Sequence, residues 1–210
     1  MQIALFGTSA DPPTMAHQDI LVWLSHHFDK VAVWASDNPF KTHQTPLEHR
    51  MQMLWLLIEA IEPPRQNIQL YPDLTHPRAI ETVRRAKEYW HDADFTLIIG
   101  SDLIPQLPRW ERVEELMQQV KLLVIPRPSY DIKETDLVTL RSLGAELAIA
   151  NISGLPVSST AYRETCDSEM LAPPIEEYVY REKLYACQNG APRNLTVSGH
   201  SPTSRSESTM

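Results

Sequence analysis

Glycine is scarce in this chain of 210 residues, which has 6 glycines against 17 prolines, and no two glycines lie close together. Two common phosphate-binding loops, G-x-x-x-x-G-K-[ST] and G-x-G-x-x-G, both need clustered glycines, so the sequence excludes both. Any phosphate that the protein binds must therefore be held by a few individually placed groups.

Positive charge is also in short supply, because 19 Lys and Arg residues face 27 Asp and Glu residues, for a formal net charge of −8. This balance argues against a general nucleic-acid-binding protein. The two cysteines, Cys166 and Cys187, form no C-x-x-C pair, which favours a reducing compartment over a disulfide framework. No apolar run approaches the length of about 18 residues that a membrane span needs. Since no signal-peptide pattern is visible either, we expect a cytoplasmic protein without a membrane partner.

Short β-like runs, several of them almost continuously apolar, alternate with helical patterns along most of the chain. The runs expected to be strands are Gln2–Phe6, Val31–Ala35, Ile68–Leu70, Phe95–Ile99, Leu122–Ile125 and Glu146–Ile149. Helices are expected at Ala16–Phe28, Leu47–Ile61, Ala79–Trp90 and Arg112–Gln119, just after Ser158, and near Pro174–Leu184. This order predicts an α/β fold, a Rossmann-like doubly wound parallel sheet with helices on both faces. Residues 1–187 would form one domain, and the polar residues 188–210 a disordered tail.

The first expected strand ends in the sequence Phe6-Gly7-Thr8-Ser9-Ala10-Asp11-Pro12-Pro13-Thr14-Met15-Ala16-His17. Ligands of doubly wound sheets bind outside the carboxyl ends of the strands. Thr14 is a good N-cap for the next helix, and His17, three residues later, faces the same side of its first turn. The imidazole would add a donor to the anion-binding amides of that helix N-terminus. The alternative is that Thr14 only caps the helix and that His17 is an ordinary packed histidine.

A second segment, Val157-Ser158-Ser159-Thr160-Ala161-Tyr162-Arg163, places three hydroxyl residues at a helix start. Arg163 follows Thr160 by three residues and Ser159 by four, so the guanidinium, the hydroxyls and the helix amides would converge on one side. We interpret the segment as a phosphate clamp built without glycine. Plain helix capping beside a solvated arginine is the alternative.

These two segments resemble the [T/H]-x-G-H and S-S-T-x-x-R motifs of the nucleotidyltransferase superfamily, in the same order along the chain. Thr8, Ala10 and Ala16 depart from the pattern, because the family has glycine, an aromatic residue and glycine there. Five further segments narrow the resemblance, which spans Gln2 to Leu184, to the nicotinate-nucleotide adenylyltransferases. They are Asn38-Pro39-Phe40-Lys41, His49-Arg50-Met51, Ile98-Ile99-Gly100-Ser101-Asp102, Leu107-Pro108-Arg109-Trp110 and Leu123-Val124-Ile125-Pro126-Arg127-Pro128.

One segment of that family, a Ser-x-Tyr-Thr sequence that contacts the pyridine carboxylate, is missing. At its place stand Thr75, Arg78 and Thr82, any of which could take over the contact. The other segments also have simpler explanations: a solvated loop lysine for Lys41, a surface arginine beside a core methionine for His49-Arg50-Met51, an N-cap for Asp102 and core packing for Trp110.

The resemblance implies that the protein joins ATP and nicotinate mononucleotide to deaminated NAD, releasing pyrophosphate, as a step of NAD biosynthesis. It implies catalytic roles for His17, Thr14, Lys41 and Arg163. ATP would be bound by Gly7, Thr8, Ser9, His17, Gly100, Asp102, Ser158, Ser159, Thr160 and Arg163. The pyridine nucleotide would be bound by Asp11, which could instead support the turn or touch the magnesium shell, and by Lys41, Arg78, Trp110 and Arg127.

The only cofactor implied is Mg²⁺, which would arrive with ATP, because no carboxylate cage for a metal is evident. Two alternatives stay open. One is a sister adenylyltransferase or cytidylyltransferase with another phosphate-ester acceptor. The other is a nucleotide-binding protein without turnover, which the departures at Thr8, Ala10 and Ala16 motivate.

Overall fold

The computed structural model describes residues 1–37, 44–128, 130–152 and 156–186. Its strands are β1 (Gln2–Thr8), β2 (Lys30–Ala35), β3 (Ile68–Leu70), β4 (Asp94–Gly100), β5 (Lys121–Ile125) and β6 (Leu147–Ile149). They form one six-stranded sheet in the order β3-β2-β1-β4-β5-β6, and every neighbouring pair is parallel. The predicted doubly wound α/β fold is confirmed.

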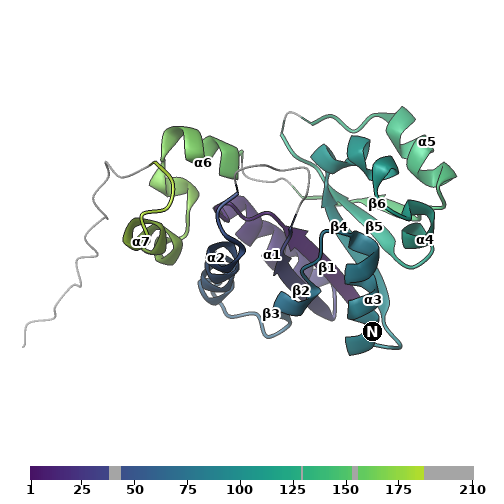
Figure 1. Cartoon of the computed structure of the whole chain (residues 1–210), viewed down its shortest axis with the longest axis horizontal. Coiled ribbons are helices and arrows are strands. Elements are labelled where there is room, and N and C mark those ends of the chain that lie inside the picture. The colour runs from purple at the N-terminus through teal and green to yellow at the C-terminus, as the bar shows by residue number, and fades with distance from the viewer. Residues whose placement is uncertain (38–43, 129, 153–155, 187–210) are drawn as a thin grey trace, which may run out of the picture.

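Helices cover both faces of the sheet (Figure 1). One face carries α1 (Met15–His27) and α2 (Leu47–Glu59), and α6 (Ser159–Thr165) and α7 (Pro173–Arg181) lie beyond α2 on the same side. The opposite face carries α3 (Ala79–Tyr89), α4 (Val113–Met117) and α5 (Glu134–Ser142). Three short 3-10 helices complete the described chain: η1 (Pro72–Leu74), η2 (Ser101–Arg109) and η3 (Ser168–Met170).

The central strands are buried on both faces, as their apolar sequences predict. In β1, Ala4 and Phe6 belong to the core under α1 and α2, whereas Ile3 and Leu5 belong to the core under α3 and α4. A shift of one residue in the pairing would exchange the two sets of side chains between cores of different shape. The two cores therefore fix the register in which β1 pairs with its neighbours, and so they also fix the position at which β1 ends.

The structure also contains elements that the sequence pattern does not predict. Helix α5 buries only Leu137 and Leu140, so its apolar stripe is too narrow to stand out. The 3-10 helix η2 contains Pro105 and Pro108, which break any α-helical pattern. Cys166 is disulfide-bonded, which the spacing of the two cysteines does not predict.

Several predictions of the sequence fall outside the described residues. The proposed disordered tail (188–210), Cys187 and the segment that carries Lys41 are among them, so nothing tests the predicted domain boundary. Within the described ranges, every helix is too short or too polar to cross a membrane.

Candidate functional site

The order of the strands reverses between β1 and β4, because β1 leads to β2 and β3 on one side, whereas β4 leads to β5 and β6 on the other. In doubly wound sheets the ligand crevice opens at the carboxyl ends of the two strands at such a switch point. The turn that follows β1 lies there, and it is unusually rich in buried polar side chains. They are Thr8, Asp11, Thr14 and His17.

At the end of β1, the backbone makes the contacts that the structure shows. Gly7 pairs with Trp34 of β2, and a Cβ atom at Gly7 would lie 2.5 Å from Trp34 Cε2, so no other residue fits without moving the indole. The Thr8 carbonyl accepts a hydrogen bond from the Ser36 amide at 2.8 Å, and the Ser9 carbonyl accepts one from Arg50 at 3.0 Å. The part of Gly7, Thr8 and Ser9 in binding ATP stays a prediction.

Thr14 and His17 contact each other at the start of α1, as their spacing predicts. The Thr14 amide donates to His17 Nδ1 at 3.1 Å, and the Thr14 hydroxyl lies 3.0 Å from the same nitrogen. Because an amide N–H can only donate, Nδ1 must accept, and a neutral imidazole then carries its proton on Nε2. The first turn of α1 contains no acidic residue. This end of the helix therefore combines amide dipoles with an oriented imidazole donor, which suits an anion.

Helix α6 joins this turn from the other end of the chain. Ser159 Oγ donates to the Pro12 carbonyl at 2.8 Å, and Arg163 Nη1 donates to the Asp11 carbonyl. Arg163 Nη2 lies 3.3 Å from Thr160 Oγ1, while Ser158 Oγ caps the helix by accepting from the Ala161 amide. The two sequence motifs thus form one cluster, in which the Arg163 guanidinium is held by protein groups.

A second cluster lies at the end of β4. Asp102 Oδ1 lies 3.2 Å from Arg127 Nε, and Arg127 Nη1 lies 3.5 Å from Asp102 Oδ2. A Cβ atom at Gly100 would overlap Asp102 Oδ1 and lie 2.6 Å from Arg127 Nε, so glycine lets these side chains cross the strand end. Asp102 Oδ1 is buried and, among the described residues, has an ion pair but no well-aligned hydrogen bond. Its charge is therefore balanced by Arg127, although its hydrogen-bonding capacity is not filled by the described residues.

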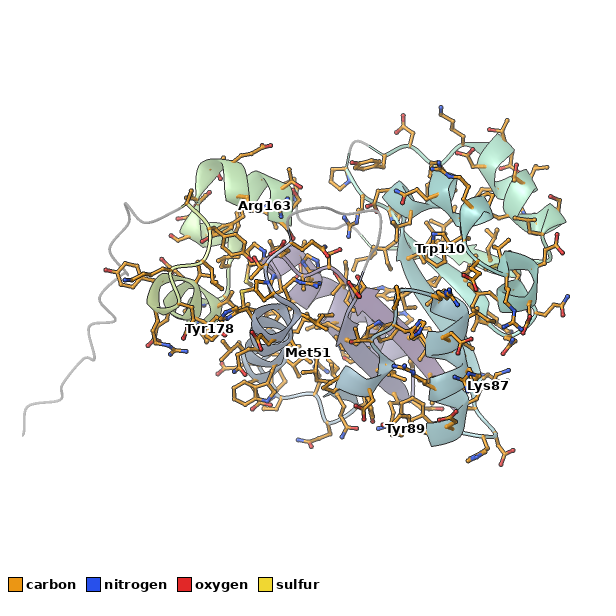
Figure 2. The ribbon with its side chains drawn as sticks, viewed as in Figure 1. Met51, Lys87, Tyr89, Trp110, Arg163 and Tyr178 are labelled. Atoms are coloured by element: carbon orange, nitrogen blue, oxygen red, sulfur yellow. The ribbon has the colours of Figure 1, made fainter. Side chains whose placement is uncertain are left out.

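Trp110 and Arg78 lie on the α3 and α4 side of the sheet. Trp110 follows η2 and packs, half-buried, against the core there, whereas Arg163 lies with α6 on the other side (Figure 2). Arg78 Nε pairs with Glu111 Oε2 at 2.8 Å, directly beside Trp110 in the chain. The sequence leaves Trp110 and Arg78 far apart, and the fold brings them to one place.

The two threonines that could replace the missing Ser-x-Tyr-Thr segment have other partners. The Thr75 hydroxyl donates to the Ala35 carbonyl at 3.1 Å, and the Thr82 hydroxyl donates to the Leu74 carbonyl at 3.0 Å. Both side-chain donors are therefore already used within the protein. Of the three candidates, Arg78 is the one whose polar group lies at the surface, in an exposed ion pair.

Comparison with known proteins gives the family. Residues 5–165 match the profile of the cytidylyltransferase-like family, which is more than half of the chain. A protein of Synechocystis sp. named "probable nicotinate-nucleotide adenylyltransferase" is 41% identical over 198 residues, which cover 88% of this chain and 99% of the relative. The chain belongs to the nicotinate-nucleotide adenylyltransferase family. A relative of the same name from Gemmatimonas aurantiaca is 30% identical, over 78% of this chain and 80% of its own length.

Solved structures agree with this family at the level of the fold. A Plasmodium falciparum nicotinic acid mononucleotide adenylyltransferase complexed with NaAD superimposes with a TM-score of 0.75 at 22% identity, covering 88% of this chain and 97% of the other. The same enzyme complexed with APC gives a TM-score of 0.73 at 23% identity, covering 88% and 96%. The resemblance that the motifs indicate is thus confirmed.

Sequence reasoning missed the role of Arg50 in this member of the adenylyltransferase family. Arg50 is not the surface residue considered above, because only 3% of it is exposed. Its guanidinium donates to the Thr45 carbonyl at 2.8 Å, the Ser36 carbonyl at 2.8 Å and the Ser9 carbonyl at 3.0 Å. Burial lowers the pKa of the Arg50 guanidinium, and the negative charge of Asp11 partly offsets this effect. Arg50 therefore connects the turn between β1 and α1 with the segments that contain Ser36 and Thr45.

Asp11 has protein partners on both carboxylate oxygens. Oδ1 accepts from the Tyr185 hydroxyl at 2.7 Å, and Oδ2 accepts from the Thr45 amide at 3.3 Å. These contacts favour the role in which Asp11 supports the turn, and its predicted contact with the pyridine nucleotide stays untested. Over the described ranges, no group of three or more His, Cys, Asp or Glu side chains could hold a metal ion.

Proposed function

We propose that the protein transfers the adenylyl group of ATP to nicotinate mononucleotide, forming deaminated NAD and releasing pyrophosphate in the cytoplasm. The observation that carries this proposal is the hydrogen-bonded union of the first turn with α6. It places the His17 imidazole and the Arg163 guanidinium in one cluster at the switch point of the sheet. Membership of the nicotinate-nucleotide adenylyltransferase family supports the choice of acceptor.

Adenylyl transfer asks for positioning and charge stabilisation more than for covalent chemistry. A phosphate oxygen of the mononucleotide attacks the α-phosphorus of ATP, and the bond to pyrophosphate breaks on the opposite side. His17, which carries its proton on Nε2, and Arg163 would donate to the ATP phosphates as negative charge builds up on the departing pyrophosphate. Thr14 orients the imidazole. Lys41, which lies outside the described residues, would steady the reacting groups.

ATP would enter as its magnesium complex, in which the phosphates hold the ion. Ser158, Ser159 and Thr160 would contribute hydroxyls and amides to the phosphates. The buried oxygen of Asp102 would accept from a ribose hydroxyl, next to Gly100. For the acceptor, Trp110 would stack on the pyridine ring, and the Arg127 guanidinium would pair with the phosphate of the mononucleotide.

The direct test measures pyrophosphate release from ATP with saturating nicotinate mononucleotide, with its amide counterpart, and with a panel of other phosphate esters including phosphopantetheine. Release with the acid mononucleotide supports the proposal. Release with another acceptor alone makes the protein a sister transferase. ATP binding by calorimetry with no turnover for any acceptor makes it a nucleotide-binding protein without catalysis.

Arg78 gives a prediction about substrate choice. Because the Thr75 and Thr82 hydroxyls are used elsewhere, we expect the Arg78 guanidinium to exchange Glu111 for the pyridine carboxylate. Replacing Arg78 with alanine should lower kcat/KM about tenfold for the acid mononucleotide, a modest value because the site is exposed. The amide mononucleotide, which has no carboxylate, should be little affected.

The matched control for Arg78→Ala is Arg84→Ala, since Arg78 lies directly before α3, Arg84 lies on that helix, and both are exposed arginines that pair with glutamates. Arg84→Ala should leave kcat/KM unchanged for both the acid and the amide mononucleotide. Equal losses on the acid and the amide in Arg78→Ala would show that Arg78 has no part in reading the carboxylate.

A further inference from the structure

The chain beyond α7 turns back onto the first turn of the protein. Lys183 and Tyr185 both adopt the left-handed backbone conformation, with φ of +53° and +63°, which residues with a Cβ atom disfavour. These two turns bring the Tyr185 hydroxyl within 2.7 Å of Asp11 Oδ1, 174 residues earlier in the sequence. Two such conformations in three residues indicate that contacts hold this segment in place.

Tyr185 contacts both halves of the phosphate-binding cluster. Its ring packs edge-on against Tyr162 of α6, with the centroids 5.9 Å apart and the planes at 85°. Its hydroxyl donates to Asp11 in the first turn. Burial raises the pKa of Tyr185 above its ordinary value, so the hydroxyl keeps the proton that it donates. Tyr185 thus bridges α6 and the first turn from the side of the C-terminal segment.

Asp11 transmits the contact to Arg163. Its carbonyl accepts from Arg163 Nη1, while its carboxylate accepts from Tyr185 and from the Thr45 amide. Only 6% of Asp11 is exposed, so water cannot readily replace a lost donor. Without the Tyr185 hydroxyl, Asp11 would shift to find another donor, and the carbonyl that orients the guanidinium would shift with it.

We propose that Tyr185 is a positioning residue of the ATP-phosphate site, which acts through Asp11 to hold Arg163 in place. This inference rests on the proposed function, because it takes Arg163 as a ligand of the ATP phosphates. It extends the site by a residue that lies outside both motifs. Tyr185, which follows α7 in the chain, then contributes to ATP binding without contacting ATP.

The test is Tyr185→Phe in the full chain, which keeps the ring against Tyr162 and removes only the hydroxyl. Because the displaced Arg163 would lose about one hydrogen bond to a charged phosphate, we expect the KM for ATP to rise about tenfold. The KM for the acceptor should stay within about twofold, because the Tyr185 hydroxyl and ring contact Asp11 and Tyr162, which belong to the cluster formed by the turn after β1 and α6. Tyr180→Phe, a half-exposed tyrosine on α7, is the matched control and should match the unaltered protein.

A double variant tests whether Tyr185 acts through Asp11. Asp11→Ala, which removes the oxygen that accepts from the Tyr185 hydroxyl, should weaken ATP binding on its own, and adding Tyr185→Phe should change the KM for ATP by less than about twofold further. If the two substitutions raise the KM for ATP by independent factors that multiply in the double variant, the proposal is overturned. An unchanged KM for ATP in Tyr185→Phe would also overturn it, as would an equal rise in the KM for ATP and the KM for the acceptor.

Calorimetric titration with ATP separates this proposal from the proposed function. If Tyr185→Phe weakens ATP binding about tenfold while no acceptor is turned over by the unaltered protein, the role of Tyr185 stands and the transferase activity fails. If the unaltered protein is active and Tyr185→Phe binds ATP as tightly, the role of Tyr185 fails alone. The calorimetric affinity for ATP distinguishes these outcomes even for a variant with reduced turnover. Thermal melting shows whether each variant is folded.

Discussion

Replacing His17 with asparagine should lower kcat about 10²- to 10³-fold, the usual cost of removing one placed donor from developing negative charge. The asparagine oxygen can take the place of Nδ1 and accept from the Thr14 amide, so the start of α1 should keep its structure. Nothing in the variant reaches the position of Nε2. Steady-state kinetics at saturating ATP and acceptor measures the loss, and circular dichroism verifies the fold.

The companion variant is His17→Gln, whose longer side chain carries its amide N–H to about the position of Nε2. It should retain more of the activity than His17→Asn, because the donor is kept and only its orientation by Thr14 is lost. Equal activity of the two variants would mean that the Nε2 donor is not what His17 supplies. Full activity in His17→Asn would reduce His17 to a capping residue.

Replacing Arg50 with methionine should have the largest effect on stability. The variant leaves the Ser9, Ser36 and Thr45 carbonyls without their donor in a buried place and removes the positive charge near Asp11. We expect the free energy of unfolding to fall by about 3–5 kcal/mol. Against a typical total of about 5–15 kcal/mol, such a loss is readily measured by denaturant unfolding.

Arg141→Met on α5 is the control for this loss, because the Arg141 side chain is half exposed and pairs with Glu134 in an exposed ion pair. It should change the free energy of unfolding by less than about 0.5 kcal/mol. Arg50→Lys should fall between the two, since lysine keeps the charge but cannot reach three carbonyls with one fork. A loss of under about 1 kcal/mol in Arg50→Met would show that the loops hold together without Arg50.

Local signals in the sequence account for most of the fold. The sequence predicts the strand Ile68–Leu70 with the bounds that the structure gives, because Ile68 and Leu70 alternate with the polar residues Asn67 and Gln69. The contact between Thr14 and His17 follows from a spacing of three in a helix. Such features depend on residues close in the chain, and their physics can be worked out from a few neighbouring side chains.

The rest of the site depends on long-range packing. The segment His49-Arg50-Met51 reads as a surface arginine beside a core methionine, and only the folded loops show three carbonyls converging on Arg50. Tyr185 stands in a segment without periodicity, so no local pattern indicates its contact with Asp11.

The first turn is completed by residues that the ribosome adds late. The six strands are complete at Ile149, whereas the groups that close the turn around Asp11 come from α6 and from Tyr185. A nascent chain can therefore assemble its sheet before the proposed nucleotide site exists. If ATP binds at this cluster, it can stabilise only the finished molecule, because binding energy acts only on a state that already has the site.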